Sequence, residues 1–364
     1  MQIHWSRNSR RNTRSAVVLG VLLVGGVAAC EQVASPDIAP VQNVTSGGAI
    51  GGRVVDLNDN PVAGASIRTA GGAEAVTDAA GQFRVSGLAA TPRLAVSVSA
   101  PGFDGTTAIY EVRSGVELRR PVRIQPKAPP VVIPAGAGGS VPLPGGGSVD
   151  IPANAFAGAS GGDPVTVRAT YISTQNAAQF STAPGDFTAR TFSGESTPII
   201  SFGMVNVEAT GPQGQALDVA PGQQVTLRFP RVPGTGPTVP VWTFDDPTGI
   251  WVEEGVATVT PTTIDVPVTT IEPRRNLDVR FRPVCITVRV LRSDKVTPRP
   301  NEWVSATGIS YAGFTQGWTN PTGIVQLQVP SSSQTLIQSG PVQQPVATPP
   351  AGTTGCPLVA TLAF

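Results

Sequence analysis

Apolar and polar residues alternate with a period of two along much of the chain. The clearest runs are residues 94–99, 165–171, 225–229 and 285–291. Because successive side chains of a strand point to opposite faces, this alternation predicts half-buried β-strands. Gly, Pro, Asn and Asp, which favour turns, interrupt the runs at short intervals. The pattern therefore predicts an all-β fold built from short strands and tight turns.

The predicted strands fall into three groups. They predict three consecutive β-sandwich domains, transthyretin-like or immunoglobulin-like, at residues 48–125, 138–272 and 283–364. Residues 126–137 are rich in proline and predict a semi-rigid linker between the first two groups. Residues 340–353, rich in Pro, Gly, Gln and Thr, predict a long surface loop in the third group.

A β-hairpin is predicted within the second group. Residues 239–244 and 250–255 have strand character and flank a turn that contains Asp, Pro and Gly. Pro267 interrupts a later strand of the same group. Because proline has no backbone N–H to donate, it predicts that this later strand lies at a sheet edge.

The first 29 residues have the three parts of a secretory signal. Four arginines and no acidic residue precede the apolar run 16–29, and small residues end that run. The run is too short to span a bilayer as a helix, which needs about 20 apolar residues. Residues 30–47 are polar and irregular, and they predict a flexible tether to the first domain.

The end of this leader, Val27-Ala28-Ala29-Cys30, resembles the lipobox of bacterial lipoproteins. The resemblance implies cleavage before Cys30, lipid on its thiol, and a membrane partner reached through that lipid. Glu31 follows the cysteine, where Asp would be the usual signal for inner-membrane retention, so the resemblance also implies outer-membrane sorting. An ordinary signal with a chance cysteine, or an uncleaved anchor, is the alternative interpretation.

Charge and histidine content exclude several functions. The four arginines of the leader are lost on cleavage, which leaves fewer Lys and Arg residues than the 24 acidic ones, so the chain lacks the basic surface that a nucleic-acid partner requires. His4 is the single histidine and also lies in the leader. The exported chain would therefore have no Ser-His-Asp or Cys-His catalysis and no histidine-ligated metal. The sequence predicts no enzyme, no cofactor and no catalytic residue.

Two cysteines remain after the lipobox, Cys285 and Cys356. An even pair in an exported protein predicts a disulfide. Its loop of roughly 70 residues would contribute about 4 kcal/mol through the entropy of the unfolded chain. Two free buried thiols are the alternative.

The first group contains the motifs Gly52-x-Val54-x-Asp56, Asn60-Pro61-Val62-x-Gly64-Ala65, Thr77-Asp78-x-x-Gly81-x-Phe83 and Ala100-Pro101-Gly102-Phe103. They resemble the carboxypeptidase regulatory-like domain, which implies a transthyretin-like sandwich without the catalytic zinc domain of the carboxypeptidases. Residues 308–313 and 319–327 of the third group have a similar turn-and-strand pattern, and this group resembles a degenerate second copy of the domain.

The second group contains Gly145-Gly146-Gly147-x-Val149-x-Ile151-Pro152 and Trp242-x-Phe244-Asp245-x-x-x-Gly249-x-Trp251. These motifs resemble the extracellular sandwich of cartilage intermediate layer proteins and, more distantly, modules of netrin receptors.

Four aromatic residues in the third group are the best candidates for ligand contact. If exposed, they would form a stacking surface for a sugar or a protein, and if buried they would form core. They are Trp303, Tyr311, Phe314 and Trp318.

Other polar groups could be considered for metal binding or catalysis. The acidic turns at 56–60 and 245–246 could bind calcium, but Asx-type turns explain them without a metal, and no metal site is predicted. Glu253 and Glu254 are neighbours on a strand. They point to opposite faces and cannot act as an acid/base pair on one bond.

These patterns together favour a lipid-anchored protein of the cell envelope. Its sandwich domains would serve binding, adhesion or scaffolding without catalysis, with a protein or glycan as ligand. One alternative function is a carbohydrate-binding surface lipoprotein. A second is an accessory subunit of an envelope enzyme.

Overall fold

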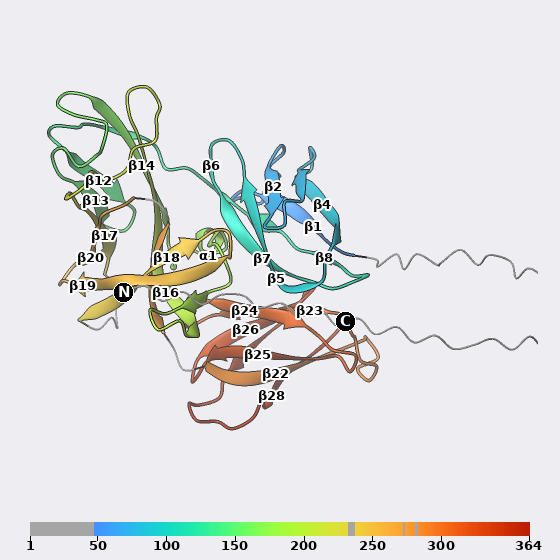
Figure 1. Ribbon diagram of the computed structural model, residues 1–364. Helices are drawn as coiled ribbons and strands as arrows, with labels where there is room; N and C mark the ends of the chain where they lie inside the picture. The colour runs from blue at the N-terminus through green and yellow to red at the C-terminus, as the bar shows by residue number, and fades with distance from the viewer. Residues whose placement is uncertain (1–46, 232–236, 272–273, 281–282) are drawn as a thin grey trace, which may run out of the picture. The chain divides into compact units, whose positions relative to one another are not determined.

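The computed structural model describes residues 47–231, 237–271, 274–280 and 283–364 (Figure 1). In this part of the chain nearly all regular structure is β-strand, beside one short helix, α1 (Ala177–Phe180). The predicted all-β fold class is confirmed. The described residues belong to one compact unit, so their division into three separate domains remains a prediction. No helix in the described segments is both long and apolar enough to cross a membrane.

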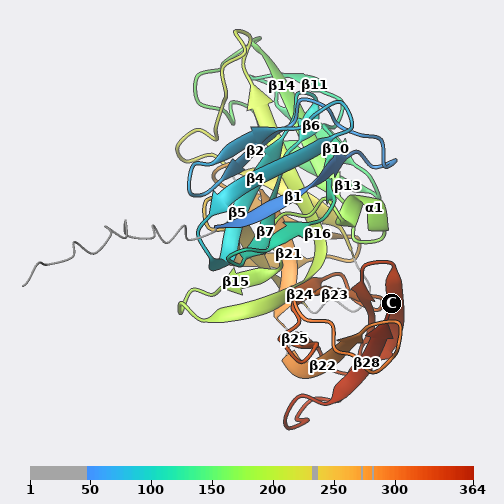
Figure 2. The same ribbon diagram turned by 90° about the vertical axis from the view of Figure 1, so that its right-hand side faces the viewer.

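The first sandwich packs two small sheets face to face (Figure 2). Ile50, Ile67, Val96 and Tyr110 are buried between the sheets. One sheet contains β1 (Gly48–Val55), β4 (Gln82–Leu88), β8 (Glu117–Arg119) and β9 (Val122–Arg123); the other has the order β3 (Glu74–Val76), β2 (Ser66–Thr69), β5 (Thr91–Ser99), β7 (Thr106–Val112). A separate short pair is formed by β6 (Phe103–Asp104) and β10 (Gln125–Pro126).

Turn chemistry fixes the ends of these strands. The Asp56 carboxylate accepts backbone N–H bonds from Asn58 and Asn60 at 2.8 and 2.9 Å, which satisfies it as an Asx turn. These bonds and the Asn60 side chain hold the pKa of Asp56 below its ordinary value. Gly81 has φ +74°, and a Cβ there would lie 2.6 Å from the Val54 carbonyl oxygen, so only glycine fits.

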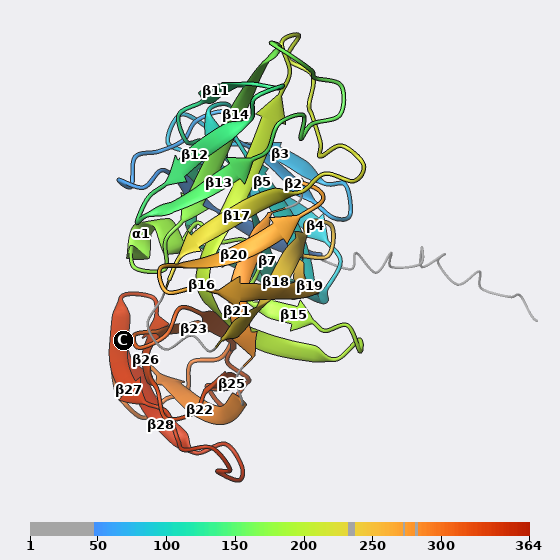
Figure 3. The same cartoon turned by 90° about the vertical axis from the view of Figure 1, so that its left-hand side faces the viewer.

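The second sandwich is formed by a single eleven-stranded sheet whose two end strands, β11 and β12, contact each other (Figure 3). The closed sheet surrounds one apolar core that includes Val165, Val225 and Leu277. The strand order is β11 (Val131–Pro134), β14 (Pro164–Ile172), β16 (Ser196–Thr210), β21 (Arg275–Arg280), β18 (Thr238–Asp245), β19 (Ile250–Val259), β20 (Thr263–Val268), β17 (Val225–Pro230), β13 (Gly147–Ile151), β12 (Gly139–Leu143), with β15 (Thr188–Arg190) beside β16 and β19.

Two sequence predictions for this sheet differ from the structure. The predicted linker 126–137 contains β11, which pairs with β14 and places Ile133 in the core. The strand with Pro267, β20, is not an edge strand, because it pairs with both β17 and β19. Its pairing with β19 ends at Asp265. No residue of β19 therefore pairs with Pro267, and the missing N–H of the proline costs no hydrogen bond on that side. The predicted hairpin is present as β18 and β19.

The third sandwich packs a three-stranded sheet on a four-stranded one. The predicted loop 340–353 contains a strand, β27, which pairs along its whole length with β26. The sheets have the orders β25 (Ile324–Pro330), β22 (Pro283–Leu291), β28 (Leu358–Ala363) and β24 (Phe314–Trp318), β23 (Trp303–Gly308), β26 (Gln334–Ser339), β27 (Val342–Ala347).

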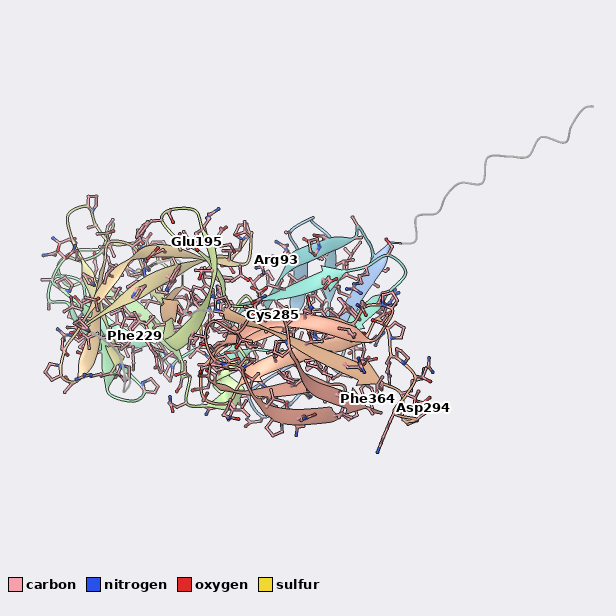
Figure 4. All side chains as sticks on the ribbon, turned by 90° about the horizontal axis from the view of Figure 1, so that it is seen from below. Arg93, Glu195, Phe229, Cys285, Asp294 and Phe364 are labelled. Atoms are coloured by element: carbon pink, nitrogen blue, oxygen red, sulfur yellow. A yellow bond between two sulfur atoms is a disulfide. The ribbon has the colours of Figure 1, made fainter. Side chains whose placement is uncertain are left out.

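The predicted disulfide is present in this sandwich. Cys285 on β22 is bonded to Cys356, just before β28, with the two Cα atoms 4.6 Å apart (Figure 4). Cys30, the predicted leader and the predicted tether up to residue 46 lie outside the described residues.

Candidate functional site

A groove of about 800 Å³ is formed by segments from the second and third sandwiches. Among the described residues that line it, none is Asp, Glu, Lys or Arg. The lining consists of aromatic rings, hydroxyl groups, one amide side chain and a few small or aliphatic residues. They are Thr174, Gln175, Ala177, Phe180, Ser181, Ile200, Ser201, Phe202, Thr307, Gly308, Ile309, Ser310, Tyr311, Ala312, Phe314 and Ser333.

One wall of the groove contains aromatic rings that are held by a buried ring. Asn176 caps α1, and its side-chain oxygen accepts the Gln179 N–H at 3.1 Å. At the end of this helix Phe180 stacks on buried Phe187, with ring centroids 5.3 Å apart. Phe314 meets the edge of Phe187 at 5.4 Å. Phe180 and Phe314 are half-buried, and their contacts with Phe187 hold both rings in defined orientations at the groove.

The connection between β23 and β24 forms another part of the lining. At Gly308 a Cβ would lie 2.0 Å from the Tyr311 carbonyl oxygen, so this close approach requires glycine. The Tyr311 hydroxyl is hydrogen-bonded to Thr335 at 3.1 Å, and burial raises the pKa of Tyr311 to about 12. Its hydroxyl therefore stays protonated at neutral pH. The Ala312 carbonyl accepts the Ser201 N–H at 2.9 Å, which ties the connection to β16.

Polar groups lie behind the floor of the groove. The Ser201 hydroxyl donates to the Asn276 side-chain oxygen at 2.7 Å, and both residues are buried. Asp278, paired with Ser201 across the strands, is completely buried. Neither of its carboxylate oxygens has a hydrogen-bond partner within the described residues. Burial raises the pKa of Asp278 well above its ordinary value.

The structure separates the four aromatic residues predicted from the sequence into two pairs. Tyr311 and Phe314 line the groove. Trp303 and Trp318 contact each other edge to face at 5.2 Å and pack against the core of the first sandwich, and Trp318 is only 7% exposed. They contribute to core packing between sandwiches and form no exposed platform.

Sequence reasoning missed the other two rings of the groove, Phe180 and Phe202. They lie more than 100 residues before Tyr311 in the chain. Nothing in the local pattern around either residue indicates that the two segments meet.

The acidic residues considered for metal or acid/base chemistry have structural partners. Asp246 accepts a hydrogen bond from Thr107 of the first sandwich at 2.7 Å. Glu254 pairs with buried Arg275 at 3.0 Å, and Glu253 accepts the Phe192 N–H at 3.1 Å. Across the described residues, no group of three or more His, Cys, Asp or Glu side chains is placed to hold a metal ion.

Charged contacts join the first sandwich to the second. The Arg93 guanidinium pairs with Asp186 and donates to the Gly249 carbonyl at 2.8 Å, at the tip of the β18–β19 hairpin (Figure 4). Arg274 pairs with Asp104 at 3.1 Å, and their side chains are only 10% and 4% exposed. Asp186 also lines a smaller hollow of about 260 Å³ that shares Tyr311 and Phe314 with the groove.

Contacts also join the first sandwich to the third. The guanidinium of Arg120 lies over the Tyr110 ring, 4.3 Å from its centroid, and donates to Gln316 on β24 at 2.9 Å. The strands around the groove are therefore held by all three sandwiches.

We expect Arg93→Ala to lower the free energy of unfolding by about 2 kcal/mol, because Asp186 and the Gly249 carbonyl lose a charged donor while partly buried. Chemical denaturation measures this change, and limited proteolysis should show earlier cleavage around 245–249. Arg68→Ala is the matched control. Its pair with Glu74 is 67% and 60% exposed, and its loss should change stability by less than about 1 kcal/mol. Equal losses in the two variants would contradict a joining role for Arg93.

Comparison with known proteins identifies part of the chain. Residues 49–125 match the carboxypeptidase regulatory-like domain, which confirms the prediction for the first sandwich. Among individual proteins, cartilage intermediate layer protein 2 of Mus musculus is 32% identical over 94 residues. That match covers 25% of this chain and only 8% of the mouse protein.

Three solved bacterial structures illustrate how distant the structural matches are. The Bacillus anthracis TIE protein is 11% identical, with a TM-score of 0.21, over 88% of this chain and 51% of that one. BcpA, the major pilin subunit of Bacillus cereus, is 12% identical, with a TM-score of 0.20, over 87% and 98%. The major pilin SpaD of Corynebacterium diphtheriae is 6% identical, with a TM-score of 0.21, over 87% and 96%. At these TM-scores the likeness carries no argument about function.

Proposed function

We propose that this chain is a lipid-anchored protein of the bacterial cell envelope whose sandwiches form a non-catalytic unit for binding and scaffolding. The proposal depends mainly on the groove. Its described lining offers aromatic rings and neutral hydrogen-bonding groups but no carboxylate, amine or thiol. General acid/base catalysis most often uses such groups, and a Ser or Thr hydroxyl becomes a nucleophile only beside a general base, which the described lining lacks. The lining is thus suited to holding a ligand without reacting with it.

The connections between the sandwiches support a scaffolding role. Arg93, Arg120 and Arg274 each join the first sandwich to another one. A unit fixed in this way holds its groove in one shape, which lowers the entropy cost of binding. The carboxypeptidase regulatory-like domain contributes to this framework, and the groove itself lies outside it.

The membrane location is supported by the lipobox around Cys30 and by the disulfide, which is typical of exported proteins. One acyl chain binds a membrane only marginally, and stable attachment takes two signals, which a diacylglyceryl group at Cys30 would supply. Outer-membrane sorting is inferred from Glu31.

We expect Cys30→Ser to move the protein from the membrane fraction to the soluble fraction, because the thiol that carries the lipid is lost. Density separation of envelope membranes followed by immunoblotting measures the shift, and wild-type protein should be found with the outer membrane. Ser35→Ala, in the same predicted tether, is the control and should stay with the membrane. A Cys30→Ser protein that still sediments with membranes would refute the lipid anchor.

A further inference from the structure

We propose that the groove binds a neutral oligosaccharide, an assignment that deepens the proposed binding function and depends on it. A pyranose ring has apolar C–H faces and a rim of hydroxyl groups, each of which both donates and accepts hydrogen bonds. The lining of the groove contains the complement of both features. The neutral aromatic and hydroxyl lining favours a neutral sugar over a charged ligand, and the occupied backbone donors of β16 disfavour a peptide.

Aromatic rings provide surfaces for the apolar faces of a sugar. Phe180, Phe202, Tyr311 and Phe314 all reach the groove and are half-buried, so part of each ring is available. The negative face of an aromatic ring attracts positively polarised C–H groups. Phe180 and Phe314 are already held against Phe187, which means that little side-chain freedom is lost on binding.

Neutral polar side chains provide the partners for sugar hydroxyl groups. Thr174, Ser181, Ser310 and Ser333 supply hydroxyls, and Gln175 supplies an amide. A hydroxyl or amide can donate to one sugar hydroxyl and accept from another. The volume of about 800 Å³ lies in the range of ligand sites, about 300–1,000 Å³, and is suited to a short oligomer.

The same lining disfavours charged ligands. Recognition of carboxylate, sulfate or phosphate groups commonly relies on Arg or Lys, and none occurs among the described residues of the lining. Asp278, behind the floor, is completely buried and is not among the residues of the lining. A ligand that carried charges would lose its hydration without gaining a counter-charge.

An extended peptide is disfavoured because two backbone donors of β16, the strand in the floor, are already occupied. Peptides that join a sheet edge are held by main-chain hydrogen bonds. On β16 the N–H of Ile199 donates to the Phe187 carbonyl at 3.1 Å, and that of Ser201 donates to the Ala312 carbonyl at 2.9 Å. These donors are occupied within the chain itself.

Titration calorimetry of the lipid-free chain against maltopentaose, cellopentaose and hits from an array of neutral glycans tests the assignment. Oligogalacturonate serves as the acidic probe and a neutral extended peptide as the peptide probe. We expect saturable binding of at least one neutral oligosaccharide and none of the other two classes. Preference for the acidic probe or the peptide, or a neutral array without binding, would overturn the assignment while leaving the Cys30 result unaffected.

Matched variants test whether binding occurs in the groove. Phe202→Ala should raise the Kd about tenfold, because a ring contact worth about 1.4 kcal/mol is lost. Phe192→Ala, at a ring that is 71% exposed outside the groove, should leave the Kd unchanged. Equal effects of the two changes on the Kd would refute binding in the groove.

Ile309→Arg and Val296→Arg form a second pair that avoids disturbing the core, because both residues are more than half exposed. Ile309→Arg places a long charged side chain at the groove and should also raise the Kd about tenfold, whereas Val296→Arg should not change it. Thermal melting of each variant shows whether it is folded. Wild-type affinity in a folded Ile309→Arg protein would refute the site even if Phe202→Ala failed to fold.

Discussion

Replacing Cys285 and Cys356 together with serine should lower the free energy of unfolding of the third sandwich by about 4 kcal/mol. The two residues are 71 positions apart, so their bond removes much of the freedom of the unfolded chain. Unfolding in urea, followed by tryptophan fluorescence, measures the loss. Trp303 and Trp318 report on this sandwich, and Trp242 and Trp251 of the second sandwich contribute to the same signal. Treating the wild-type protein with a reductant should give the same change, and the same treatment should leave the double variant unaltered.

The position of the bond explains why the loss should be large. Next to the disulfide, the Thr287 N–H donates to the Pro357 carbonyl at 2.8 Å, and the Thr287 hydroxyl donates to the Cys356 carbonyl at 2.7 Å. The parallel pairing of β22 with β28 begins at this point. Parallel strands need a long connection, and the disulfide brings its two ends together.

The change should also reach the first sandwich, because Trp318 packs against its core. Two observations would refute the prediction. One is labelling of both cysteines by a thiol reagent without reductant. The other is a double variant that unfolds at the same urea concentration as the wild-type protein.

Most of the fold follows from local sequence, and the strands that were missed share a physical feature. Runs such as 165–171 and 225–229 have a buried face, and their alternation predicts β14 and β17. The strand β27, Val342–Ala347, lies at a sheet edge and contains two glutamines and a proline. An edge strand needs hydrogen bonds on one side only, so it tolerates polar residues and proline and looks like a loop in the sequence.

The candidate site was less predictable, because its residues meet only through contacts between distant segments. The residue types at Tyr311 and Phe314 suggested ligand contact, but so did those at Trp303 and Trp318. Packing against the first sandwich decides which pair is covered, and that packing has no local signal. The buried Asp278 is a similar case, since the stretch 274–280 contains three arginines and resembles a solvated strand.

Asp278→Asn should stabilise the protein at neutral pH. The carboxyl is fully buried, and burial raises its pKa well above the ordinary value of 3.8. Below pH 3.8 the carboxyl is protonated in both the folded and the unfolded protein, so it has no effect on stability. As the pH rises above 3.8 the unfolded chain ionises first, and the wild-type protein loses stability until the raised pKa is reached.

Asparagine has nearly the same shape and no charge, so the variant avoids this loss. The difference in unfolding free energy between variant and wild type should be small at pH 3 and should grow steadily toward neutral pH. Chemical denaturation of both proteins at a series of pH values between 3 and 8 measures it. A variant less stable than the wild type at pH 7 would show that Asp278 is ionised and has a partner in the folded protein.

Asp294→Asn provides a control of opposite sign. Hydrogen bonds from Thr297 and from the backbone of Val296 lower the pKa of Asp294 to about 2, and this residue lies on the surface. Its contribution to stability is present above pH 3.8 and is lost as the pH falls through 2. Asp294→Asn should therefore be the less stable protein at neutral pH, and its difference from wild type should shrink in acid. Opposite pH trends in the two variants would separate a carboxyl that is held neutral by burial from one that is held ionised by hydrogen bonds.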